Sequence, residues 1–351
     1  MYAYRLTGWE QTPRLLETET PAPQAGQVLV RVAGNGLCQS DLHLSHMPQE
    51  LCASLGWNMP FTLGHEVGGW IESWGAGVNG LEKGEPVALV SPQSCGACLE
   101  CASGYDNICT LGRAGRGYGL DGGLAEFVLL DSVRPLIKLH KLDPFSAGPL
   151  TDAGSTSYHA VNRVRGKLTA GASALLIGAG GLGSFALQYL RLLGKAEILV
   201  ADVNAGARRR AAQLGAHACI DSSSLDLQEE VGKLTSGRGA QVVLDFVGTD
   251  ETIAAGIACL APRGSFVLIG AGSGGHADPL YAALAAKAAD IYAFQGPTVA
   301  DTRAVMQLAE QGELENRIEW FDFDEASIQS AYQKLASGDL NGRAVIRVGG
   351  N

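Results

Sequence analysis

An alternation of apolar and helical runs through the second half of the chain restricts the fold more than any other feature. From Ser155 onward, short apolar runs of β-strand character alternate with Ala- and Leu-rich runs of helical period. Strand–helix alternation at this spacing indicates βαβ units and a doubly wound parallel sheet, an α/β fold. The expected strands cover 174–177, 198–202, 217–221, 241–246, 265–269 and 291–294, and the expected helices cover 182–193, 207–214, 225–234, 252–260 and 282–288.

The rest of the chain has a different texture. Up to about Asp152 it is rich in Gly, Pro and short apolar runs without helical period, which is typical of an irregular, mostly β domain. After Phe294 come two amphipathic helical runs, 301–311 and 325–335, and a strand-like run at 343–348. This tail does not extend the strand pattern, so we expect it to pack back on the first domain. A length of 351 residues is sufficient for two domains.

The charge of the chain argues against several classes of partner. The net charge is −10, from 26 basic and 36 acidic residues, and no excess of cations is available to neutralise phosphates. The uncharged stretch 168–190 is long enough to cross a bilayer, but its several glycines favour a strand, a turn and a buried helix. The N-terminus has no signal-peptide core. We therefore expect a cytoplasmic protein with neither nucleic acid nor a membrane as partner.

Four cysteines lie close together in the pattern C-x2-C-x2-C-x7-C, at Cys95, Cys98, Cys101 and Cys109. In an acidic chain without a secretory signal, this spacing favours a metal cage over disulfides. Four sulfurs around one ion describe a closed structural zinc site, which holds a loop and does no chemistry. The catalytic residues are therefore expected elsewhere.

A glycine-rich turn follows the first strand of the alternating region. A G-x-G-x-x-G motif carries little weight alone in a chain with 47 glycines, but this one follows the apolar run 174–177 and opens a helical run. Such a turn lets the backbone approach a pyrophosphate, and Asp202, at the end of the next strand, can accept from a ribose 2′-hydroxyl. A dinucleotide site is predicted; the alternative is a structural turn. The motif residues are Gly178, Gly180, Gly181, Leu182 and Gly183.

Asp202 also predicts which dinucleotide binds. A carboxylate repels the 2′-phosphate of NADP(H), so NAD(H) is favoured. The basic cluster 208–210 lies close downstream, and Arg208 is a candidate cofactor contact that could soften this preference. The alternative for the cluster is a solvated helix face.

Two further segments have the residue types of a second metal site. One carries Cys38, Ser40, Asp41 and His43, and the other is the run Gly-His-Glu at 64–66. Taken singly, such a cysteine is more often a buried thiol, and such a histidine more often a satisfied core residue. Their combination and order are what indicate a site.

Together these motifs resemble the zinc-containing alcohol dehydrogenases of the medium-chain dehydrogenase/reductase superfamily, and within it a bacterial secondary-alcohol branch. The resemblance covers essentially the whole chain and includes the turn at 121–123 and the closing Asn-Gly-Arg at 341–343. It implies a Rossmann domain at 154–293 inserted in a mostly β, GroES-like catalytic domain. That domain would comprise 1–153, with the cysteine lobe, and the return segment 294–351.

The resemblance also assigns ligands to a catalytic zinc, which makes two zinc ions per chain. Cys38 and His65 match the first two ligands, and Asp152 matches the third, where many members have cysteine. One thiolate, one neutral imidazole and one carboxylate bring Zn²⁺ to zero net charge. Glu66 matches a transient fourth ligand of some relatives, or else a carboxylate that orients the site. Asp41 is expected to accept a hydrogen bond from His65.

The activity implied by the resemblance is reversible hydride transfer between an alcohol or ketone and NAD(H). Ser40 is expected to contact the substrate and take its proton, and His43 to pass the proton to solvent. Arg343 matches a residue that pairs with the pyrophosphate, and its alternative is a surface arginine beside a turn. Four positions at strand ends match contacts to the cofactor: Phe246, Val247, Ile269 and Gly270.

The substrate is the least determined part. The segment 45–58 carries apolar residues, including Trp57, that could line a pocket, pack in the core or contact another subunit. With Tyr118 and Phe294 as further candidate contacts, we expect a medium-sized, apolar secondary alcohol or its ketone. The alternatives are a zinc polyol dehydrogenase, which usually has Glu in place of Asp152, and a non-catalytic nucleotide-binding protein on the same scaffold. The family forms dimers or tetramers, so a homodimer or homotetramer is expected.

Overall fold

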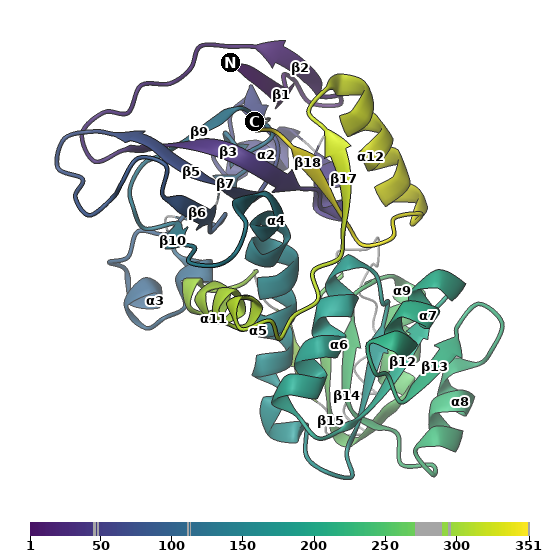
Figure 1. Cartoon of the computed structure of the whole chain (residues 1–351). Helices are drawn as coiled ribbons and strands as arrows, with labels where there is room; N and C mark the ends of the chain where they lie inside the picture. The colour runs from purple at the N-terminus through teal and green to yellow at the C-terminus, as the bar shows by residue number, and fades with distance from the viewer. Residues whose placement is uncertain are drawn as a thin grey trace. The chain divides into compact units, whose positions relative to one another are not determined.

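The structure is a computed structural model, and it describes residues 1–44, 47, 49–110, 112, 114–270, 290–293 and 296–349. The chain divides into two compact units, one formed by Met1–Ser155 together with Gly296–Asn351 and the other by Thr156–Gln295 (Figure 1). The second unit therefore interrupts the first along the sequence.

A parallel sheet forms the centre of the unit Thr156–Gln295. The described strands lie in the order β13-β12-β11-β14-β15-β16, and every neighbouring pair is parallel. In chain order this is 3-2-1-4-5-6, the order of nucleotide-binding doubly wound sheets, so the predicted fold class is confirmed. The strands are β11 (Ser173–Ile177), β12 (Glu197–Asp202), β13 (Ala218–Asp221), β14 (Ala240–Asp245), β15 (Leu260–Leu268) and β16 (Asp290–Tyr292), and the helices are α6 (Gly181–Leu193), α7 (Ala205–Gln213), α8 (Leu227–Leu234) and α9 (Asp250–Ala258).

Most boundaries in this unit lie within two residues of the prediction, and the largest difference is at the start of β15. The helix expected at 252–260 ends at Ala258, and the strand expected at 265–269 begins at Leu260 as part of β15. Leu260 is buried and pairs with Ala240 of β14, and a burial pattern alone does not distinguish a helix end from a strand start. The helix expected at 282–288 and the end of the strand expected at 291–294 lie outside the described residues.

Sheets in which most strand pairs are antiparallel form the other unit. Its larger sheet has the order β10-β6-β5-β3-β18-β17 with β9 also paired to β3, and smaller sheets join β2-β1-β4 and β7-β8. The strands are β1 (Tyr2–Leu6), β2 (Arg14–Glu17), β3 (Val28–Gly36), β4 (Phe61–Thr62), β5 (Glu66–Trp74), β6 (Pro86–Leu89), β7 (Gly115–Arg116), β8 (Gly119–Leu120), β9 (Phe127–Leu130), β10 (Leu136–Lys138), β17 (Ile318–Asp322) and β18 (Arg343–Arg347).

The C-terminal tail completes this larger sheet. β18 pairs antiparallel with β3, so the predicted return of the tail to the first domain is confirmed. β17 pairs parallel with β18 and was not predicted, because its residues are half-buried or exposed and form no apolar run. The tail helices are α11 (Val299–Glu310) and α12 (Glu325–Ser337).

Short helices interrupt the N-terminal part, where we expected almost none. That expectation is wrong because these helices are brief, and because Gly and Pro hide the helical period of the one at Pro144–Pro149. Asp143 caps one of them by accepting a hydrogen bond from Phe145 N–H. They are α1 (Gln39–Leu44), α2 (Gln49–Ser54), α3 (Leu99–Ala102), α4 (Pro144–Pro149), the 3-10 turn Asp106–Ile108 and a π-helical turn, Leu150–Gly154. The helix α5 (Ser155–Arg163) and the 3-10 turn Arg165–Lys167 follow them and, apart from Ser155, belong to the other unit.

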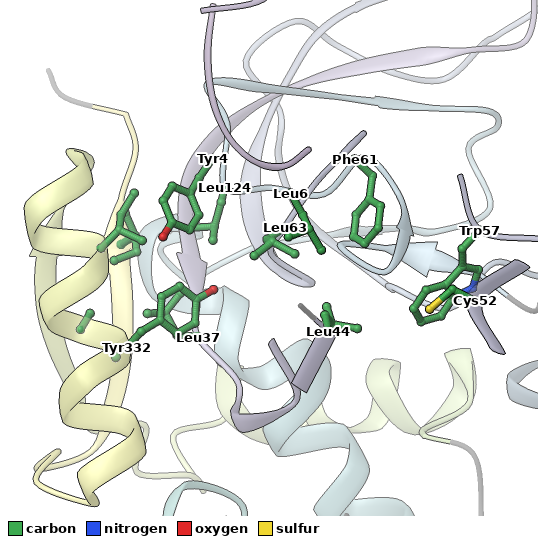
Figure 2. Close-up of a cluster of buried hydrophobic side chains, with 14 residues drawn as sticks. Tyr4, Leu6, Leu37, Leu44, Cys52, Trp57, Phe61, Leu63, Leu124 and Tyr332 are labelled. Atoms are coloured by element: carbon green, nitrogen blue, oxygen red, sulfur yellow. The ribbon is translucent and has the colours of Figure 1, made fainter. Parts of the chain in front are cut away.

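A cluster of buried side chains joins the N-terminal strands to α12. Tyr4 and Leu6 of β1 meet Leu37, Phe61 and Tyr332 there, as Figure 2 shows. Because α12 comes from the tail, burial of this apolar surface connects the two ends of the chain.

The third glycine of the G-x-G-x-x-G turn generates a stability prediction. A Cβ on Gly183 would lie 2.0 Å from the carbonyl oxygen of Gly178, whereas a Cβ on Gly180 would meet no atom within 4 Å. Overpacking of this kind costs about 1–3 kcal/mol. We expect Gly183→Ala to lower the thermal unfolding midpoint of its unit by several degrees. The matched control Gly180→Ala should leave the midpoint unchanged, and equal midpoints for both variants would contradict the packing argument.

Candidate active site

Pairing between β3 and β5 brings two of the predicted ligands together. Gly36, at the end of β3, lies opposite Glu66, at the start of β5. Cys38 therefore follows one strand and His65 precedes the other at the same edge of the sheet. Both side chains are buried.

The third predicted ligand comes from the turn after α4. That helix packs on β3 and β5, and the chain continues from it into the π-helical turn Leu150–Gly154, which holds Asp152. Hydroxyls close the turn, because Thr151 donates to Gly148 O at 2.8 Å and Ser155 donates to Leu150 O at 2.6 Å. Single π-helical turns occur frequently at functional sites.

Cys38, His65, Glu66 and Asp152 form a cluster whose candidate ligand atoms all lie within 4.8 Å of one another. Nε2 of His65 is 3.4 Å from Oδ2 of Asp152. Two ligands about 2.1 Å from a tetrahedral zinc ion lie about 3.4 Å apart, so this spacing fits a shared ion. Sulfur, imidazole nitrogen and carboxylate oxygen are also the donors that zinc takes.

Glu66 adds a second carboxylate that is paired with Arg343. One of its oxygens, Oε1, accepts from the buried guanidinium, which also donates to Leu37 O at 2.8 Å. The other oxygen, Oε2, is buried without a hydrogen-bond partner among the described residues. Burial raises the pKa of Glu66 to about 7, and the charge of Arg343 acts against this rise.

Asp41 lies behind the cluster. Its Oδ1 is 3.0 Å from Nδ1 of His65, which leaves Nε2 facing the candidate metal position. Its Oδ2 accepts from Cys38 N–H at 3.1 Å. Burial lowers the pKa of His65, but the charge of Asp41 and hydrogen bonds with Asp152, Asp41 and Cys38 raise it well above its usual value.

Helix α1 separates buried from exposed functional groups. Asp41 and Leu44 are buried, whereas Ser40 and His43 are exposed. Residues three apart lie on the same side of a helix. The predicted relay residues Ser40 and His43 therefore share one exposed face, directly after Cys38.

Aromatic rings adjoin the cluster. The ring centroids of His65 and Tyr118 are 6.0 Å apart, and those of Tyr118 and Trp57 are also 6.0 Å apart. Trp57 also packs edge-on against Phe61 at 6.3 Å. Of the predicted substrate residues, Tyr118 thus lies beside the ligand His65, and Trp57 lies behind Tyr118 in the buried core cluster; Phe294 lies outside the described residues.

The four lobe cysteines form a second cluster, and none of them is in a disulfide. Sγ of Cys95 is 4.0 Å from that of Cys101, and Sγ of Cys98 is 3.9 Å from that of Cys109. Tetrahedral zinc with bonds of 2.3 Å places sulfurs about 3.8 Å apart. The spacing therefore fits a metal cage and is far too long for a disulfide.

The lobe already stabilises thiolate charge at two positions, because backbone N–H groups lower the pKa of both Cys95 and Cys98. Backbone N–H groups of Ala97 and Cys98 point at the sulfur of Cys95 and lower its pKa to about 6. Burial instead raises the pKa of Cys101 to about 12. A cation at the centre of the cluster would relieve that burial cost.

The glycine turn lies at the carboxyl end of β11. Gly178 has a left-handed φ of 86°, and α6 begins directly after Gly180. Asp202 Oδ2 accepts from Ala179 N–H at 2.7 Å, so the acidic residue also supports the turn. Gly181 and Leu182 form the first turn of α6, where backbone N–H groups are free to meet an anion.

Arg208 is already engaged beside Asp202. Its guanidinium donates to Asp202 O at 2.8 Å and to Oδ2 of Asp221 at 2.6 Å. Asp221 in turn accepts from the hydroxyl of Ser223 at 2.6 Å. These bonds reduce the availability of Arg208 to a 2′-phosphate.

The remaining predicted cofactor positions separate into two groups. Val247 is exposed, and Phe246, Ile269 and Gly270 are half-buried, at the carboxyl ends of β14 and β15 beside Gly178. Arg343 lies in the other unit, and its guanidinium contacts Glu66. The alternative of a surface arginine is therefore wrong, because Arg343 is 5% exposed.

Sequence reasoning missed two residues at these sites. Asp245, at the end of β14, accepts from Val247 and Gly248 N–H and holds the loop that meets Gly178. Tyr332 of α12 donates to Asp41 at 3.1 Å. Burial, and then the charge of Asp41, raises the pKa of Tyr332 well above its usual value. An acid at a strand end was a usable signal for Asp245, but no local pattern pointed to Tyr332.

Among the described helices, none combines the length and the apolar character that a membrane span requires.

Comparisons with known proteins agree with this architecture. Residues 24–141 match the alcohol dehydrogenase GroES-like domain, and residues 181–311 match the zinc-binding dehydrogenase family. An NAD-dependent alcohol dehydrogenase of Saccharolobus solfataricus is 33% identical over 91% of this chain and 92% of that protein. The D-arabinose 1-dehydrogenase (NADP(+)) of the same organism is 31% identical over 94% of this chain and 93% of that protein. The crystal structure of the alcohol dehydrogenase from the archaeon Aeropyrum pernix matches with a TM-score of 0.92 at 32% identity, covering 99% of this chain and 100% of that one.

A GroES-like region and a Rossmann sheet in this order define a medium-chain dehydrogenase/reductase. Within that superfamily, the chain belongs to the zinc-containing alcohol dehydrogenases. The predicted family and enzyme class are confirmed.

Proposed function

We propose that the chain is a zinc enzyme that interconverts a secondary alcohol and its ketone with NAD(H). The observation that carries this proposal is the cluster of Cys38, His65 and Asp152, with Glu66 beside it. We propose that Met1–Ser155 and the tail form the catalytic domain. The unit Thr156–Gln295 would bind the nucleotide. Relatives named NAD-dependent alcohol dehydrogenase support the reaction class.

The charges of the cluster suit the proposed metal. A Cys38 thiolate and an Asp152 carboxylate neutralise a divalent cation, His65 adds none when neutral, and Arg343 offsets Glu66. A zinc ion in such a site polarises a carbonyl oxygen and makes a hydroxyl more acidic, while NAD exchanges the hydride. Glu66 would either bind the ion through Oε2 or orient the site from outside.

The exposed face of α1 would move the proton. Ser40 Oγ would accept the proton of the substrate hydroxyl as it gives up its own, and the His43 imidazole would take up that released proton and pass one to solvent. Trp57 and Tyr118 would exclude water and contact the apolar part of the substrate.

A sugar or polyol is the second candidate substrate class, because a relative of 31% identity is named D-arabinose 1-dehydrogenase. A panel of secondary alcohols, polyols and aldoses with NAD⁺, and of ketones with NADH, tests the proposal. Higher kcat/KM for apolar alcohols would support it. Higher kcat/KM for aldoses or polyols would favour the second class, and no turnover of any of these would contradict the enzymatic proposal.

We also propose a homo-oligomer in the cytoplasm. The spacing of the four lobe sulfurs, which fits a metal cage, supports a reducing compartment.

Each of the two clusters should bind one zinc ion independently of the other. We expect about two zinc ions per chain in the wild type and about one in either Cys98→Ser or Cys38→Ser, because each variant loses one thiolate ligand. Elemental analysis of the purified protein measures this. Cys219→Ser, which changes an exposed cysteine outside both clusters, should keep two. Two ions in Cys98→Ser would contradict the assignment.

Ser40→Ala should lower kcat by about 10²-fold or more, the scale of a lost acid–base group, with zinc content unchanged. Steady-state kinetics at saturating NAD⁺ measures the effect. Gln39→Ala alters the exposed neighbour on the same helix and should keep wild-type turnover. Near-wild-type turnover of Ser40→Ala would remove Ser40 from the mechanism.

Asp202 should set the cofactor preference. We expect kcat/KM for NAD⁺ to exceed that for NADP⁺ by at least about tenfold, or about 1.4 kcal/mol. Asp202→Ala should bring the two values of kcat/KM closer together, because the carboxylate that repels the 2′-phosphate is lost. Glu197→Gln, at the opposite end of β12, is the matched control and should keep the ratio. Equal or better turnover of wild-type protein with NADP⁺ would overturn the assignment.

A further inference from the structure

Tyr332 connects the C-terminal helix α12 to the surroundings of the proposed metal. Its hydroxyl donates to Oδ2 of Asp41 at 3.1 Å, although 291 residues separate the two in sequence. Tyr332 is 9% exposed and Asp41 is 3% exposed. The proposed reaction gives Tyr332 no task of its own.

Asp41 makes contacts through both carboxylate oxygens. Oδ2 accepts from Tyr332 and from Cys38 N–H at 3.1 Å, and Oδ1 lies 3.0 Å from Nδ1 of His65. Two donors on Oδ2 fix the plane of the carboxylate, so Oδ1 stays directed at the imidazole. Outer partners of this kind orient a metal-binding histidine.

We propose that Tyr332 is a positioning residue for the metal site. Its hydroxyl holds Asp41 in the orientation that directs Nε2 of His65 toward the ion. This inference rests on the proposed catalytic metal, and it makes a helix near the C-terminus a determinant of metal affinity for ligands that lie between residues 38 and 152.

The packing of Tyr332 allows the hydroxyl to be tested alone. Its ring stacks on that of Tyr4, with centroids 6.3 Å apart and planes at 23°, inside the cluster drawn in Figure 2. Tyr332→Phe therefore removes one oxygen and retains the ring. Tyr4→Phe is a matched control, because Tyr4 is buried in the same cluster and has no hydrogen bond to Asp41 among the described residues.

The experiment measures zinc affinity by chelator competition in the full-length protein, with the lobe metal as an internal reference. Mutation of a residue that hydrogen-bonds to a metal ligand typically lowers metal affinity 10–100-fold. Tyr332 acts one step further out, through Asp41. We therefore expect Tyr332→Phe to lower the binding affinity for one of the two zinc ions about tenfold. Tyr4→Phe should leave the affinity for both ions unchanged. In cobalt-substituted protein, the d–d bands of the weakened site should shift in Tyr332→Phe only.

Wild-type affinity and spectrum in Tyr332→Phe would overturn the inference. An equal effect of Tyr4→Phe would also overturn it, because general core packing would then explain the change. Wild-type protein that binds only the lobe metal would overturn the proposed catalytic metal itself, a result separate from either of these.

Discussion

The antiparallel pairing of β3 with β5 is the constraint on which the rest of this molecule depends. Because Gly36 lies opposite Glu66, the residues just beyond this pair, Cys38 and His65, are brought together by backbone hydrogen bonds. Asp152 joins them through α4, which packs on the same two strands. A shift of register by one residue would turn the side chains of a strand to the opposite face. The metal site is therefore a consequence of strand register.

Charge pairing makes such a buried site tolerable. Glu66 and Arg343 form an ion pair at 0% and 5% exposure, and loss of one partner of a buried pair typically costs about 3–5 kcal/mol. Arg343 begins β18, which pairs with β3, so the tail supplies the cation. The tail is thus part of the electrostatics of the site as well as of the sheet.

Much of this arrangement could be predicted from sequence because it is recorded in local patterns. Strand–helix alternation and the turn at Gly178–Gly183 indicate the parallel sheet, and cysteine spacing indicates the lobe. The missed features depend on long-range contacts. β17 has no apolar run, α4 is disguised by Pro and Gly, and Tyr332 acquires its partner only when α12 packs beside α1. The pairing of Arg343 with Glu66 likewise spans 277 residues, and no short motif encodes it.

The two cysteine-containing clusters differ in the length of chain that separates their ligands. The lobe sulfurs lie between Cys95 and Cys109, so a short segment can wrap an ion with little loss of chain entropy, before distant parts have docked. The cluster of Cys38, His65 and Asp152 exists only after β3 has paired with β5 and α4 has packed on them. Metallation during biosynthesis would then have an intrinsic order, with the lobe loaded early and the other position loaded only by a nearly native chain.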